Sequence, residues 1–66
     1  MQIVVNGKSM EAEDGMTLSG FVRSLGFNPE TLVAEHNGEI VPRGEFDERA
    51  LSPGDRLELV RLVGGG

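Results

Sequence analysis

The chain has 66 residues, no cysteine and a formal net charge of −5, which predicts one small domain without disulfides, thiolate metal sites or a cysteine nucleophile. Six cations against eleven acids argue against nucleic-acid binding, because a nucleic-acid binder must neutralise phosphates. No apolar run is long enough to span a membrane, and no signal-peptide pattern opens the chain. We therefore expect a cytoplasmic domain that binds neither nucleic acid nor membrane.

Residues 1–13 predict a β-hairpin. Apolar side chains in residues 1–5 recur at the two-residue period of a half-buried strand. Asn6-Gly7 is a strong signal for a tight hairpin turn, because both residues tolerate positive φ. The segment after this turn is expected to return as a second strand as far as residue 13.

The next segment predicts one amphipathic helix. Thr17 suits its N-cap, and Gly26 suits the position that ends it. The apolar side chains that follow Thr17 form one helical stripe: Leu18, Phe21, Val22 and Leu25. Gly20 stands where a capping box carries Glu or Gln, and an interior glycine costs up to about 1 kcal/mol relative to alanine. The sequence itself does not explain this glycine; the close approach of another backbone would.

A loop at residues 28–30 leads into a second predicted hairpin. Apolar and polar residues alternate over residues 32–37, and Asn37-Gly38 repeats the hairpin signal. The strand that returns is expected to be short, at residues 40–41. Pro42 then stops it or confines it to a sheet edge, because proline has no N–H for the ladder.

The last third of the chain predicts a turn-rich connection and a final strand. Phe46 and Leu51 are the apolar residues of the charged segment 43–51, which we expect to fold around a short 3₁₀ turn. Residues 52–55 place Pro then Gly at the centre of a type II turn. Residues 56–63 are expected to form the final strand, with Leu57 and Leu59 on the core face.

The predicted order is hairpin, helix, hairpin and final strand, which is typical of an α+β fold with one helix packed across a mixed sheet of four or five strands. We expect the final strand to lie beside the first in the middle of the sheet. This is the β-grasp (ubiquitin-like) arrangement. The predicted domain covers residues 1–63, and residues 64–66 form a flexible glycine tail.

The three terminal glycines have two interpretations. Glycine has no Cβ, so Gly64, Gly65 and Gly66 cannot pack into a core, and the tail is either a frayed end or a thin peptide that enters another protein's active site. At about 3.3 Å per extended residue, the chain from Leu62 to Gly66 reaches roughly 15 Å. On the tail alone the two interpretations are equally supported.

Short motifs occur from end to end of the chain: the start Met1-Gln2-Ile3, Thr17, the stretch from Asn37 to Arg43 (NGEIVPR), Gly54-Asp55, and the terminal Gly65-Gly66. In these motifs the whole chain resembles the ThiS family, the sulfur carriers of thiamine biosynthesis. The Gly-Gly end is shared with ubiquitin and with the small subunit of molybdopterin synthase, whose members often carry prolines before it. Residues 61–64 read Arg-Leu-Val-Gly, which favours the thiamine assignment. Gly20 departs from the family's usual Glu-rich helix start.

The resemblance implies a carrier that is not itself an enzyme. A ubiquitin-activating-type adenylyltransferase (ThiF-like) would use ATP to adenylate the carboxylate of Gly66, and Gly65 and Gly64 would deliver that carboxylate. A sulfur donor, such as a cysteine desulfurase or a rhodanese-type persulfide, would convert it to a thiocarboxylate. A thiazole synthase (ThiG-like) would receive the sulfur. No cofactor or metal is expected on the chain itself.

A docking surface is predicted next to the tail. Val60 and Leu62 point away from the Leu57/Leu59 core face, as Val4 points away from its own neighbours. On adjacent strands these three would form a small exposed apolar patch, the kind of surface that marks interaction sites. The flanking arginines, Arg61 and Arg56, would form its polar rim.

Other functions remain open from the sequence. The chain could serve a different sulfur pathway, such as molybdopterin synthesis, or act as a protein modifier or binding module. Catalysis is the least favoured function, because no nucleophile–base constellation exists. His36, the sole histidine, is expected to be structural. The clustered acids are expected to be solvated surface: Glu11, Glu13, Asp14, Glu45, Asp47 and Glu48.

Overall fold

The computed structural model describes residues 1–62. Its elements, in chain order, are β1 (Gln2–Val5), β2 (Lys8–Glu11), α1 (Leu18–Ser24), the 3₁₀ turn η1 (Pro29–Thr31), β3 (Leu32–His36), β4 (Glu39–Ile40), the 3₁₀ turn η2 (Arg43–Glu45) and β5 (Arg56–Arg61). Residue 63 and the predicted tail at residues 64–66 lie outside this range, so the predicted domain boundary at residue 63 stays a prediction. No helix in the described part of the chain is long and apolar enough to cross a membrane.

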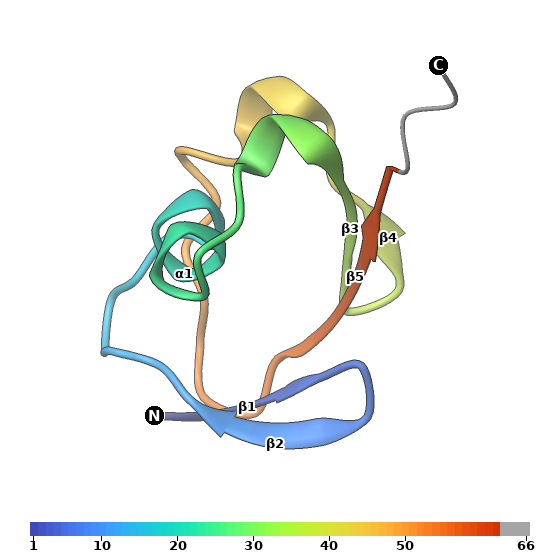
Figure 1. Cartoon of the computed structure of the whole chain (residues 1–66). Helices are drawn as coiled ribbons and strands as arrows, with labels where there is room; N and C mark the ends of the chain where they lie inside the picture. The colour runs from blue at the N-terminus through green and yellow to red at the C-terminus, as the bar shows by residue number, and fades with distance from the viewer. Residues whose placement is uncertain (63–66) are drawn as a thin grey trace.

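The strands form one mixed five-stranded sheet in the order β2-β1-β5-β3-β4. β1 runs parallel to β5, and the other neighbouring pairs are antiparallel. Helix α1 lies across one face of the sheet, with β1 and β2 below it and β3 to β5 opposite in the view of Figure 1. This confirms the predicted mixed sheet, the single helix, and the placement of the final strand beside the first.

The core lies between α1 and the inner face of the sheet. Leu18, Phe21 and Val22 of the helix are at most 1% exposed, which confirms three of the four residues of the predicted apolar stripe; Leu25, at the C-cap, is partly buried and packs against the core. Full burial of each such side chain stabilises the fold by roughly 1.5–3 kcal/mol. The sheet and its connections supply the other buried apolar residues, which are Ile3, Val5, Ala12, Leu32, Ala34, Val41, Phe46, Leu51 and Leu57.

The ends of the helix follow the predicted capping. Thr17 Oγ1 accepts a hydrogen bond of 3.2 Å from the Gly20 amide. Gly26 has φ +89°, and its N–H donates to Arg23 O at 2.9 Å, which ends the helix in the left-handed conformation. The prediction that the backbone of another segment closely approaches Gly20 is wrong, because the nearest atoms belong to the side chains of Thr17 and Met16. A Cβ at Gly20 would meet the capping hydroxyl of Thr17 at 3.3 Å, so a larger residue here would require a small shift of the cap.

The remaining boundaries differ from the prediction by a few residues. Both Asn-Gly turns form, with φ of 50° at Asn6 and 52° at Asn37. β2 ends at Glu11 because the chain then leaves the sheet to reach the helix, whereas a strand to residue 13 was predicted. β4 covers Glu39–Ile40, where residues 40–41 were predicted. η1 is a hydrogen-bonded turn in place of the predicted loop at residues 28–30.

Candidate functional site

The candidate site is the end of β5, from which the predicted glycine tail leaves. Leu62, the last described residue, donates its backbone N–H to Thr31 O at 2.8 Å. This bond extends the pairing of β5 with β3 by one residue beyond Arg61. The tail residues themselves, Gly64, Gly65 and Gly66, lie outside the described residues, so their functional roles stay predictions.

The outer face of the sheet is apolar near this end. Val60 is 60% exposed, Leu62 is 53% exposed and Ile40 on β4 is 61% exposed. Val33 on β3 is the register partner of Val60 and is half-buried. We call these four residues the exit patch. Glutamates border it, because Glu35 pairs with Ile40 on one side and with Glu58 on the other.

Two predicted members of the docking surface lie elsewhere. Val4 pairs with Arg56 in the parallel β1–β5 register. Val60 is four residues further along β5, which is about 13 Å at the rise of a parallel strand. Arg56 therefore lies at the start of β5, and Val4 lies next to it on β1. The prediction that these two residues gather beside Val60 and Leu62 is wrong. The sequence could not give the register of two strands so far apart in the chain.

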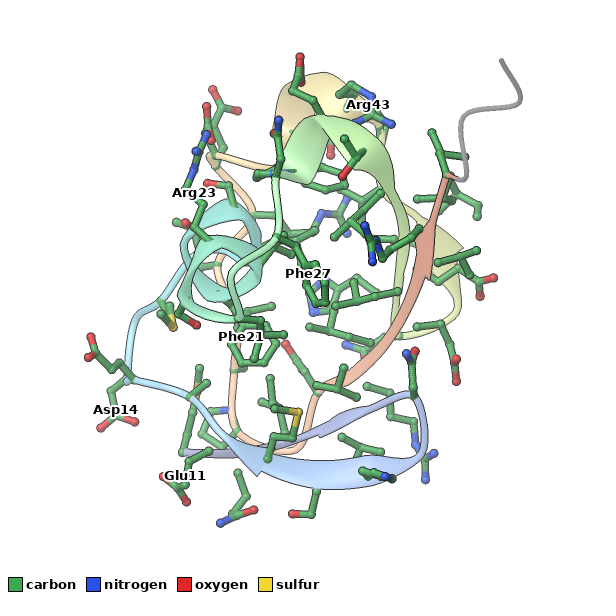
Figure 2. All side chains as sticks on the ribbon, in the orientation of Figure 1. Glu11, Asp14, Phe21, Arg23, Phe27 and Arg43 are labelled. Carbon is green, nitrogen blue, oxygen red and sulfur yellow. The ribbon has the colours of Figure 1, made fainter. Side chains whose placement is uncertain are left out.

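Arg61 faces the helix side of the sheet. Its register partner is Leu32, which is buried on the core face. The Cζ of Arg61 lies 5.4 Å from the ring centroid of Phe27, a distance typical of a cation–π contact. Figure 2 shows Phe27 between α1 and β5. Arg61 therefore contacts the segment that follows the helix. The prediction that it forms the rim of the docking surface is wrong.

The start of β5 holds a network that the sequence analysis missed. His36 Nε2–H donates to Asp55 Oδ2 at 2.6 Å, and both side chains are largely buried. Asp55 also accepts from the Ser52 amide at 2.8 Å and from Asn37 Nδ2 at 3.1 Å. Arg49 Nη1 lies 3.5 Å from the other ring nitrogen of His36. The structural role that was predicted for His36 is to bind the turn before β5.

The hydrogen bonds of this network shift the pKa values of Asp55 and Arg49. Burial raises the pKa of Asp55, but the hydrogen bonds from His36, Ser52 and Asn37 outweigh it and hold that pKa below its usual range. The hydrogen bond and charge of Glu45, 2.8 Å away, raise the pKa of Arg49. Asp55 is therefore ionised in the folded protein at neutral pH.

The turn asparagines also bind β5 through their side chains. Asn6 Oδ1 accepts from the Leu59 amide at 2.8 Å, and Asn37 Oδ1 accepts from the Arg56 amide at 2.8 Å. The Asn-Gly signal predicted only the turns. An asparagine in the left-handed conformation can bind the backbone of a third strand when its turn lies next to that strand. The position of these asparagines in the turns was therefore the signal for the bonds to β5.

One concave surface of the described chain lies away from the exit patch. A cavity of about 490 Å³ between β2 and α1 is lined by Met1, Glu11, Ala12, Glu13, Asp14, Met16 and Ser24. Glu11 and Asp14 are exposed at its edge (Figure 2). Within residues 1–62, no three His, Asp or Glu side chains are grouped to hold a metal ion. The predicted acidic clusters are exposed, as expected of solvated surface.

Comparison with known proteins decides the family. The family model described as the ThiS family matches residues 3–66, which is nearly the whole chain. The chain belongs to the ThiS family. A crystal structure of a thiamine biosynthesis protein (ThiS) from Geobacter metallireducens superposes with a TM-score of 0.85 at 29% identity, and each chain is covered completely. This confirms the predicted β-grasp fold of the ThiS family.

Two curated relatives show different contexts for this domain. The sulfur carrier protein ThiS of Escherichia coli (strain K12) is 27% identical, and the match covers all of both chains. A thiazole synthase of Magnetococcus marinus is 41% identical over all 66 residues, yet the chain spans only 20% of that protein's length. A ThiS-like segment and a thiazole synthase thus occur in one polypeptide in that relative.

Proposed function

We propose that this protein carries sulfur for formation of the thiazole ring of thiamine, with the sulfur held as a thiocarboxylate on Gly66. The observation that carries the proposal is the ThiS family match, which runs through the terminal glycines to residue 66. The described part of the chain supports it, because β5 ends in an exposed apolar patch from which a thin tail can extend.

The chemistry follows from the weakness of a carboxylate as an electrophile. A carboxylate oxygen of Gly66 attacks the α-phosphorus of ATP, pyrophosphate leaves, and an acyl-adenylate forms. A persulfide sulfur then attacks the acyl carbon and AMP leaves. A second thiol cleaves the resulting sulfur–sulfur bond, which leaves the thiocarboxylate on Gly66. The chain contains no cysteine, so the persulfide and the thiol must belong to other proteins.

The protein is then a co-substrate of its partners. An adenylyltransferase of the ubiquitin-activating type supplies ATP chemistry, and a cysteine desulfurase or a rhodanese-type protein supplies sulfur. A thiazole synthase accepts the sulfur; this partner is supported by relatives in which a ThiS-like segment is joined to a thiazole synthase. Val60 and Leu62 of the exit patch are the residues that we assign to docking, because burial of exposed apolar surface favours association.

Intact-mass spectrometry tests the proposal. The full-length protein, first shown by its mass to end at Gly66, is incubated with ATP, the adenylyltransferase and a sulfur donor. We expect its mass to rise by the difference between sulfur and oxygen, with the gain in the C-terminal peptide. Deletion of Gly66 should abolish the gain, because the reach shortens by about 3.3 Å and in-line attack needs the reacting atoms in contact.

A matched pair of valine variants tests whether the tail must be thin. Gly65→Val adds a branched side chain to the tail, and we expect it to abolish the mass gain. Ala50→Val introduces the same branched side chain at an exposed residue outside the exit patch, and it should react normally. Amide-linked conjugates without a thiocarboxylate would favour the protein-modifier function. No product with any cognate activating enzyme would refute the carrier function.

A further inference from the structure

Arg43 binds the backbone before and after Thr31, the residue whose carbonyl holds Leu62 at the end of β5. Arg43 Nη1 donates to Pro29 O at 2.7 Å, and Nη2 donates to Leu32 O at 2.9 Å. Thr31, whose carbonyl accepts the Leu62 amide, lies between these two residues in the chain. Figure 2 shows Arg43 beside the two 3₁₀ turns, close to the level at which β5 ends.

The other contacts of this arginine fix its orientation. Its Cζ lies 5.9 Å from the ring centroid of Phe46, which is only 3% exposed. The guanidinium is planar in itself, and its contact with the aromatic ring restrains where that plane lies. The η2 turn that carries Arg43 is thereby joined to the η1 turn, although the two are far apart in the sequence.

The path from Arg43 to the tail has two short steps. Arg43 holds the backbone carbonyls at each side of Thr31, and Thr31 holds Leu62. Leu32 is also the register partner of Arg61, so the second carbonyl bound by Arg43 belongs to the last full β3–β5 pair. A change in η1 would therefore move or loosen the residue from which the tail leaves.

We propose that Arg43 is a positioning residue for the glycine tail. By fixing η1 it holds Leu62, the residue that precedes the tail, and so it sets the rate at which the carboxylate is activated without touching the reacting atoms. This inference rests on the proposed carrier function. A planar fork can bind two carbonyls at once, whereas an ammonium is a point donor, so Arg43→Lys should replace Arg43 only in part.

Hydrogen exchange measured by NMR tests the structural half in the full-length protein. In Arg43→Gln we expect the Leu62 amide to exchange about tenfold faster, because two charge-assisted hydrogen bonds to η1 are lost and part of that loss reaches the Thr31–Leu62 bond. The Asn6 amide, which donates to Leu57 O at 2.9 Å near the start of β5, should be unchanged. Arg23→Gln, at an exposed arginine of α1, removes the same charge and should leave both amides unchanged.

Steady-state adenylation tests the functional half. Arg43→Gln should lower kcat about tenfold and change the KM for the carrier much less, because only Leu62 of the four exit-patch residues is loosened. Arg43→Lys should fall between it and the wild type. Unchanged exchange at Leu62, equal acceleration at Asn6, or a change in KM alone would each overturn the inference. Failure of the wild type to gain mass would instead refute the carrier function, and the exchange data would still decide whether Arg43 fixes the exit.

Discussion

The two ends of β5 are held by different kinds of contact. At its start, Asn37 binds the Arg56 amide and the His36–Asp55 pair holds the preceding turn, and Asn6 binds Leu59 in the middle of the strand. At its end, the backbone bond from Leu62 to Thr31 is the last one described, and Val60 and Leu62 are more than half exposed. The comparison suggests that the contacts at the start of β5 stabilise the fold, whereas the end of β5 exposes apolar side chains that partners can bind.

This difference predicts a large loss of stability when the start of β5 is altered. Asp55→Ala removes the acceptor of His36, Ser52 and Asn37 and leaves the buried His36 donor unpaired. We expect the free energy of unfolding to fall by about 2–3 kcal/mol, measured by urea denaturation. Asp47→Ala, at an exposed aspartate, is the matched control and should change it by less than about 0.5 kcal/mol. Equal effects of the two variants would remove the contrast between the ends.

The same aspartate predicts a pH dependence. The pKa of Asp55 is lowered in the folded protein, so its ionised form stabilises the fold above the pKa of the unfolded chain, and this contribution is lost as pH falls through the folded value. The difference in unfolding free energy between wild type and Asp55→Asn should therefore narrow as pH falls from 7 to about 3. Denaturation curves at several pH values measure it. A difference that stays constant would show that Asp55 does not carry the acid sensitivity.

The sequence predicted the elements well and the connections between distant segments poorly. The Asn-Gly turns, the helix stripe and the alternation in β3 depend on local backbone preference and periodicity, which neighbouring residues determine. The placement of Val4, by contrast, depends on the register between β1 and β5, which are separated by most of the chain. The sequence marked Arg43 and Asp55 only as members of two short motifs. Their structural roles could not be predicted, because their hydrogen-bond partners come from other segments.

The exit patch predicts a variant with a small effect on folding and a large one on binding. Val60→Asp places a charge on an exposed side chain, so the unfolding free energy should change by less than about 0.5 kcal/mol. Affinity for the adenylyltransferase should fall at least about tenfold, because the charge would be buried unpaired in the complex. Titration calorimetry measures the affinity. Ala50→Asp adds the same charge at an exposed residue outside the patch and should bind normally; normal binding by Val60→Asp would place the docking surface elsewhere.

The smallest effect is expected beyond the end of β5. Deletion of Gly65 and Gly66 removes residues without side chains, so the unfolding free energy should stay within about 0.3 kcal/mol of the wild type. Truncation after Arg61 also removes the Leu62 amide that binds Thr31, and it should cost about 1 kcal/mol, the usual net value of one hydrogen bond. Urea denaturation of the two truncated chains, side by side with the full chain, separates the tail from the strand that carries it. If the two-glycine deletion costs as much as the longer truncation, the tail is packed against the domain. The carboxylate would then have to be released before a partner could activate it.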